Sequence, residues 1–85
     1  MNDIEKLTAA VGGTPYGDAI IAEAKHLASE PAHKYAQNIK DSLDERIGVL
    51  KAYERIHRED GENAKAVAEA EKIVIAEKAL AALNS

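Results

Sequence analysis

The sequence predicts an all-α protein: a long antiparallel helical hairpin preceded by two short N-terminal helices, forming an oligomeric helical bundle. Apolar residues recur at helical spacing through most of the 85 residues. Aromatic residues make up only 4% of the chain while alanine is abundant, so the core must be thin and its helices closely packed. One strong turn signal, Asp60-Gly61, separates two long stretches, as in a hairpin. A chain of this length is expected to form a single domain over residues 1–85.

Two short helices are expected first, at residues 3–11 and 15–29. The first carries apolar residues on one face, and Gly12-Gly13 ends it because glycine readily adopts the left-handed turn that follows a helix. Thr14-Pro15 begins the second helix, since threonine caps a helix and proline fits its first position. Pro31 closes the second helix, because the residue before a proline avoids helical backbone.

Two long helices follow, at residues 32–60 and 62–83. Gly48 is the one helix-weakening residue in the first of them, and it costs about 1 kcal/mol relative to alanine without ending the helix. The inner face of that helix is expected to carry Tyr35, Ile39, Leu43, Ile47, Leu50 and Tyr53. The last helix has one apolar stripe through Val67, Ala70, Ile73, Val74, Leu80 and Ala81, and a second through Ala68, Ile75, Ala79 and Ala82.

The segment 73–83 is apolar on nearly all sides, and a helix that is apolar all round is a buried helix. Eighty-five residues offer too little chain to bury it, so we expect a dimer or a higher assembly. Arg55 and Arg58 lie in a mixed-charge cluster that could dock another protein, since arginine is favoured at interfaces. The expected interface residues are Val67, Ile73, Ile75, Leu80, Arg55 and Arg58.

The net charge of −4 argues against nucleic acid as a partner, because neutralising phosphates needs a basic face. No stretch approaches the ~18 apolar residues of a membrane span, so no membrane partner is expected. The first residues have neither the basic start nor the apolar run of a signal peptide, and the chain has no cysteine. We therefore expect a cytoplasmic protein.

Each of the three histidines follows a glutamate by three residues, which places each pair on one helix face. Because the Glu-x-x-His pair is the motif of di-iron carboxylate bundles, Glu54, His57 and Glu77 from two chains form a candidate metal site. The alternative is ordinary surface chemistry, which the ten glutamates in the chain favour. We expect the second, and hence no cofactor.

The loop Gly12–Gly17 runs into a helix N-terminus, where free backbone N–H groups and the helix dipole attract phosphate. Thr14 would add a hydroxyl, Tyr16 a stacking face and Lys25 a positive charge, which together make a candidate site for a small nucleotide. The glycine-lysine-serine or -threonine ending of a Walker loop is missing. A simple helix–helix corner, with Tyr16 covering the core, is the interpretation we favour.

No catalytic residue is predicted, because cysteine is absent and serine and threonine are scarce. We expect a non-enzymatic helical protein that forms homo-oligomers and binds and regulates or inhibits another macromolecule, in particular a protein. Its small size, helical hairpin and lack of cysteine resemble phage-borne regulators and inhibitors, so a phage-type inhibitor or counter-defence protein is one concrete form. The alternatives are an oligomeric protein that binds or sequesters nucleotides and a Glu-x-x-His metal-binding bundle.

Overall fold

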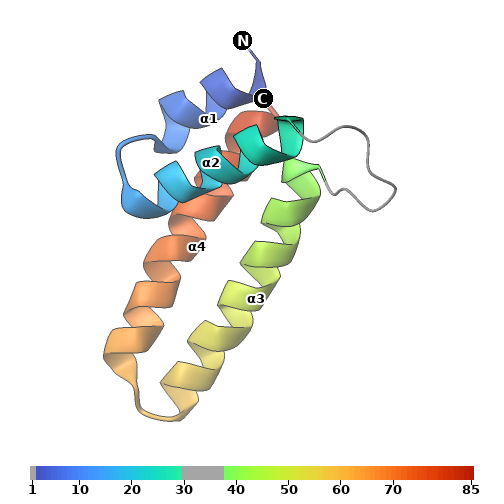
Figure 1. Ribbon diagram of the computed structural model, residues 1–85. Coiled ribbons are helices and arrows are strands. Elements are labelled where there is room, and N and C mark those ends of the chain that lie inside the picture. Colours follow the sequence, from blue (N-terminus) through green and yellow to red (C-terminus); the bar gives the residue numbers. More distant parts are fainter. Residues whose placement is uncertain (1, 30–37) are drawn as a thin grey trace.

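The protein is all-helical throughout residues 2–29 and 38–85, which are the residues that the computed structural model describes (Figure 1). This confirms the predicted all-α class, and no strand occurs in these two ranges. None of the helices in the same ranges is long and apolar enough to cross a membrane. The four helices are α1 (Asp3–Val11), α2 (Pro15–Ser29), α3 (Ile39–Glu59) and α4 (Asn63–Leu83).

Asparagine side chains cap α1 and α3 at their N-termini. The Asn2 side chain accepts a hydrogen bond from the backbone N–H of Glu5 at 2.9 Å, and Asn38 does the same for Asp41 at 2.8 Å. Asn38 has extended backbone, with φ −79° and ψ 165°, so α3 begins after it. The expectation of one continuous helix over residues 32–60 is therefore wrong, because Asn38 is not helical. Residues 32–37 lie outside the described ranges.

The corner between α1 and α2 depends on a glycine that packs against the preceding helix. Gly17, in the first turn of α2, is buried, and a Cβ at this position would collide with the carbonyl oxygen of Val11. The same Cβ would lie 2.6 Å from Oγ1 of Thr14. Only glycine lets α2 begin this close to the end of α1.

The turn from α3 to α4 is closed by backbone hydrogen bonds. The N–H of Glu62 donates to the carbonyl of His57 at 2.8 Å, and the N–H of Gly61 donates to Arg58 at 3.2 Å. Together they form a Schellman motif, which needs left-handed backbone at its glycine position. Gly61 supplies it with φ +77°. The chain therefore reverses within three residues, and α4 returns alongside α3 (Figure 1).

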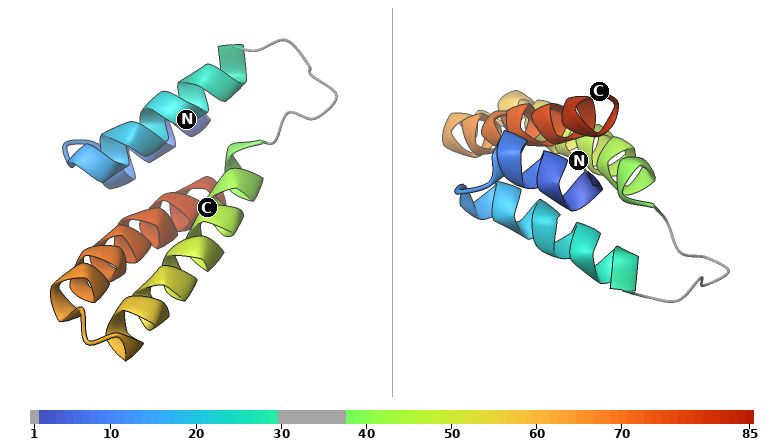
Figure 2. Two further views of the ribbon diagram at one scale, coloured as in Figure 1. Left: turned by 60° about the horizontal axis from the view of Figure 1, so that its bottom comes forward. Right: turned by 90° about the horizontal axis from the view of Figure 1, so that it is seen from above.

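Helices α1 and α2 cover only one end of the α3–α4 pair, the end where α3 begins and α4 finishes (Figures 1 and 2). The other end, around the turn, projects beyond them. The molecule measures 43 × 29 × 20 Å, and its radius of gyration of 13.8 Å exceeds the roughly 12 Å of a compact domain of this length. The end of the α3–α4 pair around the turn is thus left without covering helices from the described part of the chain (Figure 1).

The core lies where the four helices meet. Its largest fully buried side chains are Leu7 of α1, Ile20 of α2 and Leu43 of α3, each of which stabilises the fold by about 1.5–3 kcal/mol. Helix α4 contributes alanines, and Ala76 and Ala79 are completely buried. Because alanine is small, α4 approaches its neighbours closely, and it packs against all three other helices.

The buried side of α4 differs from the predicted stripes. Ile73 and Ala79 are buried, but Val67 and Val74 are exposed, and Ile75 is half-buried against the core. The reason is that α1, α2 and α3 surround α4 on several sides. The premise that a second copy is needed to bury residues 73–83 is therefore wrong, since α1 and α2 cover much of this segment within one chain.

Similar differences occur on the other helices. Tyr53, expected on the inner face of α3, is exposed because the α1–α2 pair ends before it, whereas Ile39, Leu43 and Leu50 are buried as predicted. Tyr35 lies outside the described residues.

The glycines provide a matched test of this packing. Gly17→Ala should lower the free energy of unfolding by about 1–3 kcal/mol, because the added methyl group meets backbone that cannot move aside. Gly48 lies on the exposed side of α3 with no atom within 4 Å of an added Cβ, so Gly48→Ala should raise it by about 0.5–1 kcal/mol. Urea denaturation of both variants measures these changes, and equal effects would contradict the close α1–α2 approach.

Candidate functional site

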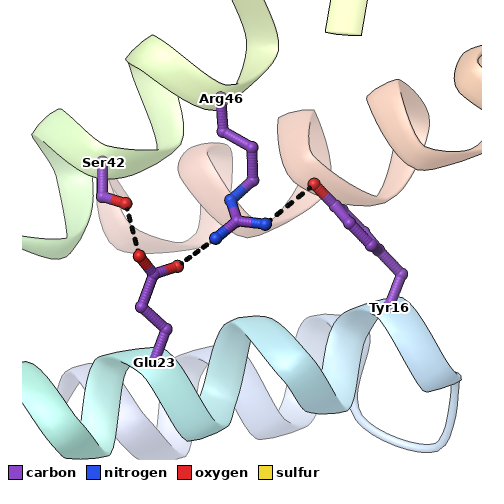
Figure 3. A network of polar contacts seen from close by, with 4 residues as sticks. All are labelled: Tyr16, Glu23, Ser42 and Arg46. Carbon is purple, nitrogen blue, oxygen red and sulfur yellow. Dashed lines mark hydrogen bonds and ion pairs between the residues drawn. The ribbon is translucent and has the colours of Figure 1, made fainter. Parts of the chain in front are cut away.

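Four polar side chains from α2 and α3 form a connected cluster at the edge of the core (Figure 3). The Glu23 carboxylate of α2 accepts hydrogen bonds from the Ser42 hydroxyl at 2.8 Å and from Nη2 of Arg46 at 2.5 Å, both from α3. Nη1 of Arg46 donates to the Tyr16 hydroxyl at 3.3 Å. The cluster therefore ties the start and the middle of α2 to the first half of α3.

Arg46 is the centre of this cluster. Its guanidinium lies 5.7 Å from the centre of the Tyr16 ring, which adds a cation–π contact. The hydrogen bond to Tyr16, with the nearby Glu23 carboxylate, raises the pKa of Arg46 above its ordinary value despite partial burial. The positive charge of Arg46 offsets the negative charge of Glu23.

A groove of about 570 Å³ opens next to this cluster, between α3 and α4 and beyond the start of α2. Arg46 and Tyr16 lie at the end of the groove nearest α2. Leu50 and Tyr53 line the side formed by α3, and Glu69 and Lys72 line the side formed by α4. The wall on α3 is polar near the cluster, where Glu45 also lines it, and apolar further along, whereas the wall on α4 is charged. This groove lies on the same face of the α3–α4 pair as α2, which covers that face nearer the start of α3.

The α3 row, which consists of Val49, Tyr53 and Ile56, continues the face of α3 that contacts α2. Ser42, Arg46 and these three residues alternate in steps of four and three, which is the spacing of a helix-packing seam. The first two residues of the series contact α2, but the row itself is 49%, 51% and 46% exposed. The seam on α3 is thus covered by α2 along its first part and exposed along the rest.

The structure does not bring the candidate metal ligands together. Glu54 accepts a hydrogen bond from Arg58 at 2.9 Å, and Nδ1 of His57 lies 3.7 Å from the Glu62 carboxylate. The Tyr53 ring stacks on His57, with centroids 6.3 Å apart. No group of three metal-ligating side chains occurs in residues 2–29 and 38–85, and Glu77 is exposed on α4. A site shared between two chains was the less favoured alternative, and nothing in this structure tests it.

The other Glu-x-x-His pairs add no ligand set. Glu23 of the first pair is engaged with Ser42 and Arg46, and the pair Glu30 and His33 lies outside the described residues.

The backbone N–H groups of Gly13 and Gly17 are bound by side chains of this corner itself. The Thr14 hydroxyl donates to the carbonyl of Val11 and accepts from the N–H of Gly17, while the Asp18 carboxylate accepts from the N–H of Gly13 at 3.0 Å. Asp18 also places a negative charge where a phosphate would bind, so these contacts favour the structural corner. Tyr16 contacts Arg46, as described above.

Lys25 does not complete a nucleotide site with Thr14. It is exposed on α2 and follows the first residue of this helix by ten residues, or about 15 Å. Its charge therefore does not lie at the helix N-terminus, where the candidate nucleotide site would need it.

The predicted interface residues fall into different environments. Ile73 is buried, whereas Ile75 and Leu80 are half-buried against the core, so these three are chiefly packing residues of one chain. Val67 is exposed and free to contact a partner. Arg55 and Arg58 are exposed beside a hollow of about 310 Å³ near the end of α3, and their docking role stays a prediction.

Sequence reasoning missed the Glu23–Ser42–Arg46 cluster. A signal was present, because Ser42 and Arg46 are the two polar members of an otherwise apolar seam on α3. A polar residue in such a position indicates a polar partner on the helix that packs there.

A double-mutant cycle tests the cluster. Arg46→Met leaves Glu23 half-buried without its charged partner, so we expect a loss of about 1–2 kcal/mol in unfolding free energy after allowing for partial exposure. Glu23→Gln in the Arg46→Met background should cost much less than in the wild type. Tyr16→Phe should cost no more than about 1 kcal/mol, because its hydrogen bond is long. Additive effects of Glu23→Gln and Arg46→Met in chemical denaturation would contradict the coupling.

Comparison of the chain with protein-family models, with curated proteins and with solved structures finds no significant match. The interpretation of the site therefore depends on its geometry.

Proposed function

We propose that this chain is a non-enzymatic helical interaction protein that binds another protein through the α3 row and the adjoining groove. The single observation that carries this proposal is the row itself: three large apolar side chains, half exposed, at the spacing of a helix-packing seam. Isolated exposed apolar residues are ordinary, but an ordered row beside a groove is typical of binding surfaces.

The composition of the surface supports protein as the partner. Tyrosine is enriched at protein interfaces, where its ring supplies apolar area and its hydroxyl stays hydrated. Tyr53 occupies the middle of the row, and Glu69 and Lys72 give the groove a polar edge. An apolar centre with a polar rim is the usual anatomy of such an interface.

The cluster supports binding rather than catalysis. Ser42, the hydroxyl that lines the groove, donates to Glu23, and Arg46 is held by Glu23 and Tyr16. These contacts hold α2 in place against α3. A protein of this kind acts by occupying its partner's surface, so the proposed outcome is regulation or inhibition of that partner.

A second proposal is self-association, with the antiparallel α3–α4 hairpin as the element that each copy contributes. The observation behind it is the outward side of α4, where Val67 and Val74 are 51% and 59% exposed. This location replaces Ile75, which packs within the single chain.

Substitution of Tyr53 tests the principal proposal. The wild-type protein, Tyr53→Ala and Lys51→Ala are each used to capture partners from a lysate of the native cell, and the captured protein is then purified for titration calorimetry. Loss of a buried aromatic anchor should weaken binding by about 2 kcal/mol or more. Lys51→Ala is the control, because Lys51 is exposed two residues from Val49 and about 200° around α3.

Binding that Tyr53→Ala and Lys51→Ala weaken equally would contradict the assignment of this surface. So would a set of captured proteins that is identical for Tyr53→Ala and the wild type.

A further inference from the structure

We propose that α4 forms the contact of a two-fold symmetric homodimer, in which it packs antiparallel against the α4 of a second copy with Val74 at the axis. In this arrangement Glu71 faces Lys78 of the partner subunit, and Lys78 faces Glu71 of the partner subunit. The inference rests on the self-association proposed above and specifies its geometry.

The contact surface is the α4 row, which consists of Val67, Glu71, Val74, Lys78 and Ala81. These residues alternate in steps of four and three, so they lie on one side of the helix. All five are exposed, whereas Ala66 and Ile73, the residues that precede the two valines, are buried within the chain. The row therefore points away from the core over about four helical turns.

The α4 row is separate from the groove on α3. Glu69 and Lys72 of α4 line that groove. Val74 follows Lys72 by two residues, which is about 200° around a helix, and Val67 precedes Glu69 by the same number. The two surfaces lie on opposite sides of α4, so a partner in the groove leaves the α4 row available.

The order of residues in the α4 row is complementary to its own reverse. In an antiparallel pair centred on Val74, a residue some positions before the centre lies opposite one about as many positions after it. Val67 then lies opposite Ala81 of the partner subunit, a large side chain against a small one. Glu71, three positions before the centre, lies opposite Lys78, four positions after it.

Symmetry doubles this match, because each dimer gains two Glu71–Lys78 contacts. A parallel pair would instead place Glu71 against Glu71 and Lys78 against Lys78, which is repulsive at both positions. Glu77 does not disturb the match, since it lies about 100° around the helix from Lys78 and outside the row. The charges therefore select the antiparallel arrangement.

Neither charge of the row has an ion-pair partner in the part of the chain that the structure describes. In residues 2–29 and 38–85, the ion pairs of the structure involve neither Glu71 nor Lys78. The two residues are seven positions apart, or about 10 Å along the helix, which is too far for them to pair with each other. A second copy supplies the opposite charge to each at the required place.

The expected dimer is weak, because a single pair of helices in contact over about 20 Å buries less than the usual ~1,600 Å² of a stable interface. Since the contacts between its charges are at the surface, its affinity should also fall as salt concentration rises.

Charge reversal tests the geometry. Sedimentation equilibrium of the full chain, from about 10 μM to about 1 mM in low salt, should show reversible dimerisation of the wild type. Glu71→Lys should weaken it by about tenfold or more, because two attractions become two repulsions. Combining Glu71→Lys with Lys78→Glu should restore the wild-type constant to within about threefold, because the opposite charges again face each other.

The matched control is Glu69→Lys, which makes the same charge change two residues away on the groove side of α4. It should leave dimerisation unchanged, and circular dichroism should show the same helicity for all variants.

A wild type that stays monomeric at about 1 mM would overturn both the self-association and this interface. A dimer that is insensitive to Glu71→Lys, or equally sensitive to Glu69→Lys, would overturn the interface and leave self-association standing.

Discussion

The close packing of α4 through its buried alanines is the constraint on which the rest of this structure depends. Ala76 and Ala79 have no exposed surface, and their small side chains let α4 lie against α1, α2 and α3 together. A core made this way uses little chain, but it fills little volume and extends only as far as the covering helices. Because α1 and α2 have 9 and 15 residues while α3 and α4 have 21 each, the short pair cannot cover the long one. The exposed end of the α3–α4 pair is thus a consequence of the lengths of the helices.

The polar cluster marks the border between the covered and uncovered parts. On one side of Arg46 the seam of α3 is closed by α2, and on the other side it is open from Val49 to Ile56. Glu23 and Tyr16 hold the arginine from two points of α2, so the helix is fixed both laterally and along its axis. A purely apolar contact at this edge would be less specific about where α2 stops, because hydrophobic burial is non-directional. The cluster thus positions the end of the groove that lies nearest α2.

The sequence was sufficient to predict the helical class because its signals are local. Apolar spacing, Gly61 in the turn and the threonine-proline start of α2 each act within a few residues.

The sequence was not sufficient where burial depends on which helices pack against one another. Tyr53 and Leu50 are both apolar members of α3, yet only Leu50 is buried, because α4 covers it and α2 ends short of Tyr53. Gly17 looks like turn punctuation in the sequence, whereas its role is to let α1 and α2 approach. The Glu23–Arg46 pair joins residues 23 positions apart, which no helical period relates.

The same distinction applies to the apolar surface of α4. Composition showed that the last helix has more apolar surface than one face can use, and this holds in the structure, where Val67 and Val74 are exposed. It did not show which part of the surplus the chain covers itself. Helices α1 and α2 cover the side that includes Ile75 and Ala79, which leaves the side that carries Glu71 and Lys78 exposed.

The charges on this exposed side are complementary to those of an antiparallel second copy, which is why we propose it as the dimer contact. Opposite it, the groove with Tyr53 has no such self-complementary order, and its apolar row with a polar edge suits a different protein. The two proposals, binding of another protein and self-association, therefore use opposite sides of α4.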